Sequence, residues 1–328
     1  MRKNKIKKKG VSLRSKHSYL AGYLCQEREK GKDSQWFPYI DILPTAFNTV
    51  PIFFDKEKLD MLTGSIALKK ISDRIASLRD EYNDICAHVP EFKRIRHEDF
   101  VWGRLVVITR IFGLVVDNEK TDGLVPLADM LNHKRPRETK WTYDQKRRGF
   151  VVTALQTVQK DCEVFDSYGG KCNSRFFVNY GFSLEENEDN EAAITLEFPK
   201  NDPQFNLKAN FLKLNPLDQK KVKECFSWLR VAHAQGNEYM TITAQNLQVH
   251  LPFISLGSYF LSDDIPPLSV RNELMVLTSL AVAAKKSLNG FKTTLEEDNK
   301  LLEDTEKFPK FSNMRNIVLM RRGEKEVM

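Results

Sequence analysis

Residues 124–182 read LVPLADMLNHKRPRETKWTYDQKRRGFVVTALQTVQKDCEVFDSYGGKCNSRFFVNYGF. The apolar run Leu124–Leu131 predicts a buried strand and turn, which breaks at the polar pair Asn132 and His133. Polar side chains directly after a buried run need partners, because an unpaired buried polar group costs about 1 to 3 kcal/mol. The stretch therefore predicts an Asn-His pair that is held by hydrogen bonds.

Two strand-like runs follow a basic segment, and turn residues close the second. The runs are Phe150–Leu155 and Glu163–Tyr168, and two glycines come directly after Tyr168. Tyr168 is therefore expected where a strand stops. A short aromatic run farther on places a second tyrosine, Tyr180, next to a glycine.

Taken together, these motifs resemble the catalytic half of a SET-domain protein methyltransferase. ADMLNH (128–133) is similar to the family's Asn-His motif. EVFDSYG (163–169) and NYGF (179–182) are similar to its tyrosine segment and closing tyrosine. The order, spacing and flanking aromatics make the resemblance specific, and it points to the branch of the Rubisco large-subunit methyltransferase and the actin-histidine methyltransferase.

The resemblance implies an α+β fold of short SET-domain strands, followed by an all-α substrate-binding domain. We expect a basic tail over 1–14, a SET domain over 15–198 with a helical insertion over about 15–95, and a Rubisco-methyltransferase-type domain over 199–328. In this fold the segment with the two tyrosines threads beneath the Asn-His segment as a pseudoknot, an exception to the usual absence of threading.

Composition limits the class of protein. The chain has 328 residues, 41% of them hydrophobic, which suits a sizeable core and two domains. Its five cysteines lack CxxC spacing, which argues against a disulfide framework or a metal site and favours a reducing compartment, cytoplasm or nucleus. No apolar segment is long enough to span a membrane, and Met1–Gly10 lacks the apolar block of a signal peptide.

The net charge of +7 is concentrated in two clusters. They comprise Arg2, Lys3, Lys5, Lys7, Lys8 and Lys9, and Lys134, Arg135, Arg137, Lys140, Lys146, Arg147 and Arg148. The first is interpreted as a solvated tail in preference to a nuclear-import or nucleic-acid segment, so no nucleic-acid partner is expected. The second either steers an acidic protein substrate or is ordinary surface charge.

The N-terminal half is expected to be mainly helical. Helices are predicted over Ser15–Gln26, behind a serine cap, and within Leu59–Ile85. Residues 31–49, which include PYIDILP, are predicted to form an irregular loop and resemble the branch's insertion. A further helix is predicted over Glu98–Leu114, ending at Gly113.

The C-terminal part is predicted to contain an acidic hinge, 185–191, and one more strand, Ala192–Phe198. From Asp218 mostly helices are expected. They cover 269–288, 293–302 and the amphipathic segment 313–325, with a broken apolar connection over 251–267. These segments resemble the branch's substrate-binding domain, which we expect to dock a folded protein substrate.

Arg110 stands alone in an apolar block, so its charge needs an anion. One solution is an intramolecular partner such as Asp129 or Asp166. The other is the carboxylate of a bound cofactor, because the family's TRxF motif places its arginine near the methionine end of S-adenosylmethionine.

The resemblance implies further site residues. Tyr168 would be the catalytic hydroxyl that orients the substrate amine. Asn132 and His133 would bind the amino and adenine parts of S-adenosylmethionine. Tyr180 would form the opposite wall, and Phe182 is expected beside the cofactor.

The same comparison bears on the substrate. Phe112 and Ala128 match the aromatic and small residues of lysine-modifying members, whereas the actin-histidine enzyme has asparagine and tryptophan there. Together with Asp129 and Tyr180 they are the expected substrate-binding residues. Taken alone, Phe112 and Ala128 would also fit an ordinary core.

The predicted function is an S-adenosylmethionine-dependent protein-lysine N-methyltransferase. A protein-histidine N-methyltransferase is the alternative enzyme. A third possibility is an inactive interaction module, since the family's N-terminal Gly-x-Gly strands, which receive the cofactor, do not match anything before Ser15.

Overall fold

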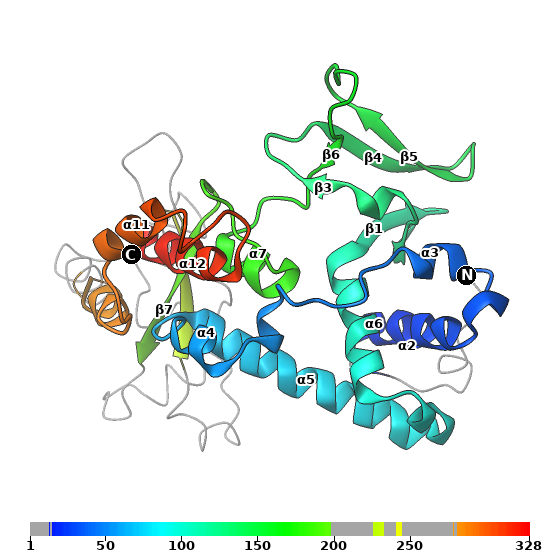
Figure 1. Ribbon diagram of the computed structural model, residues 1–328, viewed down its shortest axis with the longest axis horizontal. Helices are drawn as coiled ribbons and strands as arrows, with labels where there is room; N and C mark the ends of the chain where they lie inside the picture. Colours follow the sequence, from blue (N-terminus) through cyan, green and yellow to red (C-terminus); the bar gives the residue numbers. More distant parts are fainter. Residues whose placement is uncertain (1–12, 14, 198–225, 233–240, 245–277, 279–280) are drawn as a thin grey trace, which may run out of the picture. The chain divides into compact units, whose positions relative to one another are not determined.

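The computed structural model describes residues 13, 15–197, 226–232, 241–244, 278 and 281–328 (Figure 1). The first basic cluster, the connection 251–267 and most of the helix predicted over 269–288 lie outside the described residues. Residues 281–288 are helical. None of the described helices is long and apolar enough to cross a membrane.

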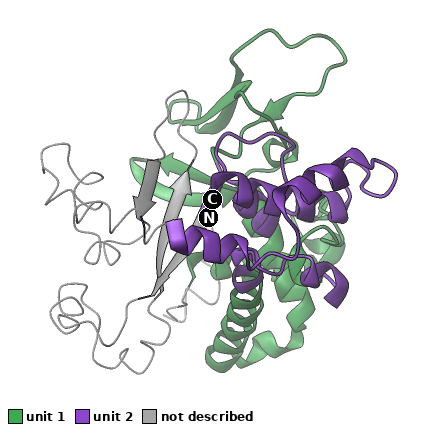
Figure 2. Ribbon diagram, turned by 90° about the vertical axis from the view of Figure 1, so that its left-hand side faces the viewer, with its two compact units in different colours: residues 1–53, 71–170 green, residues 54–70, 171–328 purple. Residues whose placement is uncertain are grey.

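The chain divides into two compact units (Figure 2). Unit 1 comprises residues 1–53 and 71–170, and unit 2 comprises residues 54–70 and 171–328. Helix α5 (Ile66–His88) begins in unit 2 and continues into unit 1.

Helices make up much of unit 1. Besides α5 they are α2 (Lys16–Glu29), η1 (Gly31–Asp33), α3 (Phe37–Asp41), η2 (Pro51–Phe53), η3 (Pro90–Arg94), α6 (His97–Arg110) and η4 (Ala128–Met130). The predicted start of α2 is confirmed, because the Ser15 side chain accepts a hydrogen bond from the His17 backbone. α2 packs against α6, where a Cβ on Gly103 would lie 2.7 Å from Cys25 Sγ. Gly103 therefore permits this close approach.

The core of unit 1 lies among α2, α5 and α6. Ile85, Phe92 and Phe100 are fully buried there. Arg104 is also buried, and its Nε donates to Glu81 Oε2 over 2.8 Å. A buried ion pair of this kind is tolerated because each charge has its partner.

The helix predicted over 98–114 ends earlier than expected, at Arg110. Residues Ile111–Val116 instead form strand β1, which pairs antiparallel with β2 (Glu119–Leu124). Asp117 and Asn118, between them, both have positive φ, as a tight hairpin turn requires. The prediction of Gly113 as a helix end is therefore wrong, because pairing with β2 overrides local helix propensity.

The loop predicted over 31–49 is only partly irregular, since it contains η1 and α3. Pro38 lies in the first turn of α3, where a missing N–H costs nothing. The prediction of an irregular loop is therefore wrong at Pro38, which lies at the start of a helix. The helices predicted within 59–85 are confirmed by α5 and, just before it, α4 (Lys56–Asp60).

Short strands complete unit 1. They are β3 (Asn132–His133), β4 (Thr139–Asp144), β5 (Gly149–Ala154) and β6 (Phe165–Asp166). β4 and β5 form an antiparallel hairpin, which confirms the run predicted over 150–155. The strand predicted over 163–168 shrinks to β6. The buried strand predicted over 124–131 is wrong beyond Leu124, because Leu127 is 74% exposed and η4 follows it.

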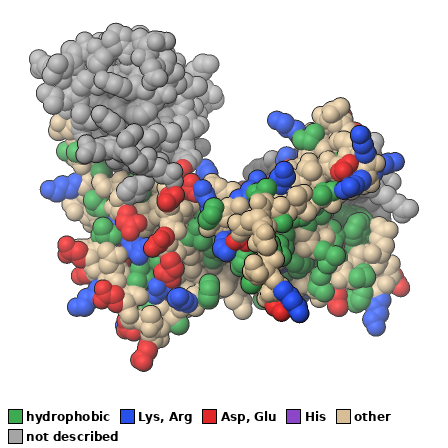
Figure 3. Space-filling view, turned by 90° about the horizontal axis from the view of Figure 1, so that it is seen from above, with side chains coloured by type: hydrophobic (Ala, Val, Ile, Leu, Met, Phe, Trp, Pro, Cys, Tyr) green, Lys and Arg blue, Asp and Glu red, His purple; other side chains and the backbone are tan. Residues whose placement is uncertain are grey.

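The second basic cluster lies largely on the β4–β5 hairpin and its approach. Lys140 and residues 146–148 are exposed there. Figure 3 shows one face of the molecule, on which basic and acidic side chains are interspersed. The structure thus leaves both interpretations of this cluster open.

Unit 2 contains α4, α7 (Asn173–Tyr180) and a sheet in the order β7-β8-β9. Its strands are β7 (Glu191–Glu197), β8 (Phe226–Ala232) and β9 (Thr241–Ala244). β7 confirms the strand predicted there. The prediction of helices is wrong for the stretches 226–232 and 241–244, whose alternating and β-branched residues pair with β7 and with each other.

Two helices close the chain, as predicted. α11 (Leu295–Glu303) begins with a complete capping box between Thr294 and Glu297. α12 (Asn313–Val327) confirms the final helix, and in the structure it is buried on nearly all sides. Its basic residues turn inward, and Lys325 Nζ donates to Asp298 Oδ2 over 2.6 Å.

Candidate functional site

The Asn-His segment and the tyrosine segment lie side by side through a parallel strand pair. In the register of β3 and β6, Asn132 is opposite Phe165 and His133 is opposite Asp166. The Lys134 backbone N–H continues the ladder to the Asp166 carbonyl over 2.9 Å. Parallel strands need a long connection, and here the β4–β5 hairpin supplies it. This arrangement brings the two motifs together, while the threading itself stays a prediction.

Tyr168 is held by this pairing at two points. Its backbone N–H donates to His133 Nδ1 over 3.0 Å, and its hydroxyl donates to the Leu131 carbonyl over 2.9 Å. The two rings lie 5.1 Å apart, tilted by 32°. Because Nδ1 accepts a hydrogen bond, the neutral His133 ring carries its proton on Nε2. The contact holds the His133 ring beside Tyr168.

Asn132 lies at the surface, contrary to the expectation of a buried polar pair. Its side-chain Nδ2 donates to Glu163 Oε1 over 2.6 Å. The bond joins β3 to the residues just before β6. Glu163 was not among the predicted site residues, although it begins the tyrosine segment EVFDSYG (163–169).

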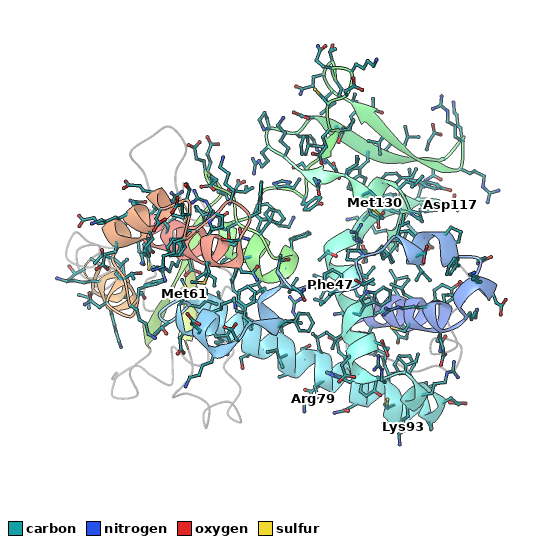
Figure 4. The ribbon with its side chains drawn as sticks, viewed as in Figure 1. Phe47, Met61, Arg79, Lys93, Asp117 and Met130 are labelled. Atoms are coloured by element: carbon teal, nitrogen blue, oxygen red, sulfur yellow. The ribbon has the colours of Figure 1, made fainter. Side chains whose placement is uncertain are left out.

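Arg110 is the last residue of α6 and contacts the η4 turn. Its Nη1 donates to the Asp129 carbonyl over 2.8 Å and lies 3.5 Å from the sulfur of Met130, which is labelled in Figure 4. The nearest carboxylate oxygen, Asp129 Oδ2, is 3.6 Å away. Of the two intramolecular partners considered, Asp129 is present, whereas Asp166 instead accepts from Thr139.

The guanidinium of Arg110 retains binding capacity. Its Nε is buried and has no hydrogen-bond partner among the described residues. The side chain as a whole remains 17% exposed. A donor left over beside a buried carboxylate is a reason to expect an additional anionic group, so this residue fits the carboxylate of S-adenosylmethionine.

Asp129 is held from a second side by Tyr39 of α3. The Tyr39 hydroxyl donates to Asp129 Oδ2 over 2.6 Å. Burial raises the pKa of Asp129, which the bond from Tyr39 and the charge of Arg110 partly offset. Burial and the adjacent Asp129 also raise the pKa of Tyr39, so its hydroxyl stays protonated. Tyr39 was not among the site residues predicted from the sequence.

Phe112 and Ala128 lie in unit 1 and are both half-buried. Phe112, in β1, meets the rings of Trp141 and Phe150 edge to face at 5.3 and 5.1 Å. Ala128 begins η4, directly before Asp129. Phe112 therefore belongs to an aromatic cluster between two hairpins, which is compatible with a channel wall and with a small core.

Tyr180 and Phe182 belong to unit 2, at the end of α7. Phe182 stacks on Phe176 at 5.1 Å, and Tyr180 lies 6.1 Å from each of these rings. Gly181, with φ of 80°, ends the helix in the left-handed conformation that favours glycine. Burial raises the pKa of Tyr180, so the hydroxyl remains neutral.

A cavity of about 810 Å³ lies in unit 1 between α2, α3 and the β1–β2 hairpin. Its walls include Tyr23, Trp36, Tyr39 and Leu124. Tyr39 thus has the cavity on one side and Asp129 on the other. Over the described residues there is no group of three or more His, Cys, Asp or Glu side chains that could hold a metal ion.

Known proteins are similar to this chain in sequence and in fold. Residues 199–328 match the family model described as Rubisco LSMT substrate-binding. Over 98% of the chain, the structure matches the SET domain of LSMT bound to lysine and AdoHcy, with a TM-score of 0.73 and 23% identity, and covers 75% of that chain.

The chain has the SET-domain fold of Rubisco LSMT.

Sequence relatives extend this result. The ribosomal lysine N-methyltransferase set10 of Schizosaccharomyces pombe is 29% identical over 283 residues, which are 78% of this chain and 50% of the relative. The actin-histidine N-methyltransferase of Mus musculus is 27% identical over 330 residues, 94% of this chain and 54% of the relative. The chain spans about half the length of these SET-domain relatives.

Proposed function

We propose that this SET-fold chain belongs to an S-adenosylmethionine-dependent protein N-methyltransferase that modifies lysine. The main support is the joining of three distant motifs in unit 1. The β3–β6 pair holds Tyr168 against His133, and Arg110 contacts the η4 turn that leads into β3. Both lysine and histidine N-methyltransferases are among the relatives.

The chemistry asks mainly for alignment. S-adenosylmethionine supplies a methyl group on a cationic sulfonium, which is already a good electrophile. The protein must place a neutral amine in line with the carbon–sulfur bond, and effective molarity from such placement accounts for much of the rate. Free lysine has a pKa of about 10.4, so an apolar channel must favour the uncharged amine by desolvation.

Each candidate residue has one role in this scheme. Tyr168, anchored through its backbone to His133, orients the amine and the methyl group. Asn132, His133 and Arg110 bind the methyl donor, with Arg110 facing its carboxylate. For Tyr180 and Phe182, in unit 2, the resemblance implies the role of aromatic residues whose π faces favour a sulfonium and a methylated ammonium.

Lysine is preferred over histidine because of Phe112 and Ala128. An aromatic ring packed against Trp141 and Phe150 suits an aliphatic stem better than an imidazole that needs hydrogen bonds, and Ala128 matches the small residue of the lysine-modifying members. The histidine alternative keeps support from the actin-histidine relatives. The substrate is proposed to be a folded protein docked on residues 199–328, in line with the description of the matched family model.

The first test is calorimetric titration of S-adenosylmethionine into the chain. We expect the parent protein to bind and Arg110→Ala to lose measurable binding. Arg94→Ala is the matched control, because Arg94 forms an exposed ion pair with Glu29 and should bind like the parent. An absence of binding by the parent chain would favour the inactive interaction module.

The second test identifies the modified residue. Acceptor proteins labelled with a radioactive methyl group are hydrolysed, and the methylated amino acids are separated. We expect methyllysine from the parent and at least a tenfold loss of it in Phe112→Asn, which removes the aromatic wall. Methylhistidine as the parent's product would establish the histidine alternative.

A further inference from the structure

Tyr39 connects the helical insertion to the proposed methyl-donor site. It lies in α3, is 7% exposed, and contacts Asp129 across 90 residues of sequence through a bond of 2.6 Å. Its neighbour in this contact, the Asp129 side chain, is fully buried. The bond is therefore shielded from water, where a hydrogen bond to an ionised group is comparatively strong.

Asp129 in turn holds Arg110 by two of its own groups. Its carbonyl accepts from Nη1 over 2.8 Å, and its carboxylate Oδ2 lies 3.6 Å from the same nitrogen. Oδ2 is also the atom to which Tyr39 donates, whereas Oδ1 has no partner among the described residues. The carboxylate thus takes its orientation from Tyr39 on α3 and Arg110 on α6.

We propose that Tyr39 is a positioning residue for the methyl donor. It keeps Asp129 oriented and ionised, and through Asp129 it keeps the Arg110 guanidinium in place for an anionic group of the ligand. The inference rests on the proposed function, since it assumes that Arg110 binds the carboxylate of S-adenosylmethionine.

The charge balance explains why a hydroxyl is needed at this position. The charged and titratable groups that face Asp129 among the described residues are Tyr39 and Arg110. Burial favours the protonated carboxyl, and a protonated Asp129 would give Arg110 no counter-charge. Loss of the donor from Tyr39 shifts the pKa of Asp129 upward. As the pH is lowered, binding that needs the carboxylate should therefore begin to weaken at a higher pH than in the parent.

The cavity provides a matched control. Tyr23 and Tyr39 both line it, but the Tyr23 hydroxyl accepts from Trp36 Nε1 over 3.1 Å and makes no contact with Asp129. Tyr39→Phe and Tyr23→Phe therefore remove the same atom from the same cavity wall. Only Tyr39→Phe removes a hydrogen bond to Asp129, the residue that contacts Arg110.

The experiment is titration of S-adenosylmethionine into the full chain between pH 4 and 8. We expect Tyr39→Phe to bind about tenfold more weakly at pH 7, the effect of one lost hydrogen bond. As the pH is lowered, the affinity of Tyr39→Phe should also begin to fall at a higher pH than the affinity of the parent does. Tyr23→Phe should match the parent at every pH.

Asp129→Asn separates positioning from simple packing. The amide keeps the shape of the carboxyl but cannot titrate, so we expect weaker binding whose pH dependence lacks the Asp129 component. In this background Tyr39→Phe should cost no more than about twofold, because Tyr39 acts through Asp129. If thermal unfolding shows that Tyr39→Phe does not fold, Asp129→Asn still tests whether the carboxylate is needed for binding.

Three results overturn the inference. In the first, Tyr39→Phe binds with the parent's affinity and pH profile. In the second, Asp129→Asn binds as tightly as the parent. In the third, the double variant loses affinity by the full product of the fold-losses of the two single variants. Each leaves the proposed function intact as long as the parent binds. If the parent itself binds no S-adenosylmethionine, the proposed function fails first and takes this inference with it.

Discussion

Tyr168 shows how a single residue is fixed without lying in a regular strand. β6 ends at Asp166, yet Tyr168 is constrained by its backbone bond to His133 and by its hydroxyl bond to Leu131. Both partners belong to the Asn-His segment. A hydroxyl held in this way loses little further freedom when it meets a substrate, which is what alignment of an amine requires.

We expect Tyr168→Phe to reduce methyl transfer by about a hundredfold to a thousandfold, the usual effect of removing one aligned polar group from a reacting centre. Binding of S-adenosylmethionine should change by less than about threefold, since the His133 contact uses the Tyr168 backbone. Single-turnover kinetics and calorimetry measure the two quantities. Tyr143→Phe, in β4, is the control. Equal loss of binding and rate would mean that Tyr168 only supports the fold.

Candidate residues were predicted from motif order, and their partners mostly were not. Asn132, His133 and Tyr168 lie together as expected for one site. The contacts of Arg110 with Asp129 and of Tyr39 with Asp129 join residues 19 and 90 positions apart. No local pattern specifies such a pair, because it depends on how α3, α6 and η4 approach one another.

At the scale of elements, the predictions held where short-range interactions dominate. The serine cap of α2 and the capping box of α11 involve residues within one turn, so they are visible in the sequence. The end of α6 was misplaced because strand pairing with β2 lies outside the turn. The loop predicted over 31–49 missed α3, because proline breaks a helix interior but is favoured in its first turn.

Two loops of unit 2 cross with almost no space between their backbones. A Cβ on Gly64 would lie 2.5 Å from the backbone of Gly290 and Phe291, and Gly64 has φ of 91°. Gly31 also has positive φ, but a Cβ there would meet nothing within 4 Å. The two glycines therefore form a matched pair for separating backbone strain from crowding.

Gly31→Ala should cost about 1 to 2 kcal/mol through its left-handed conformation alone. Gly64→Ala should cost about 1 to 3 kcal/mol more, because the new methyl group must displace backbone rather than a flexible side chain. Urea unfolding of the two variants beside the parent measures the free energy of each. Equal losses would show that the loop at Gly290 moves aside without cost.

On a larger scale, unit 2 contains a cluster of buried charged residues on α11 and α12. Asp298 and Lys325 have almost no exposed side-chain surface and are paired with each other, and Arg321 shares Asp298. Glu324 is also buried, but its Oε1 has no partner among the described residues. Burial raises the pKa of Glu324 to about 7, despite a side-chain bond with Ser65. Ionisation of Glu324 should therefore change the free energy of unfolding of the protein.

The sign of this effect follows from the raised pKa. The folded protein binds the proton of Glu324 more tightly than the unfolded chain, whose glutamate titrates near 4.3. The stabilisation is complete below about pH 4 and disappears as the pH rises through about 7. Relative to the parent, Glu324→Gln should gain about 3 kcal/mol of unfolding free energy across this interval, from the linkage between pKa and stability. Urea unfolding at pH 4, 5.5, 7 and 8 checks it, and a constant difference between the two proteins would contradict the prediction.

By itself the sequence determined the order of the motifs, the helix caps, the β4–β5 run and the resemblance to SET-domain methyltransferases. These features depend on residue types within a few positions, where hydrogen bonds and side-chain periodicity act directly. Tertiary structure alone decided that Arg110 pairs with Asp129 rather than Asp166, that Tyr39 completes this contact, and that β1 ends the helix early. The reason is physical: a buried charge or unpaired strand takes the partner that folding brings within reach, and that partner can lie anywhere in the chain.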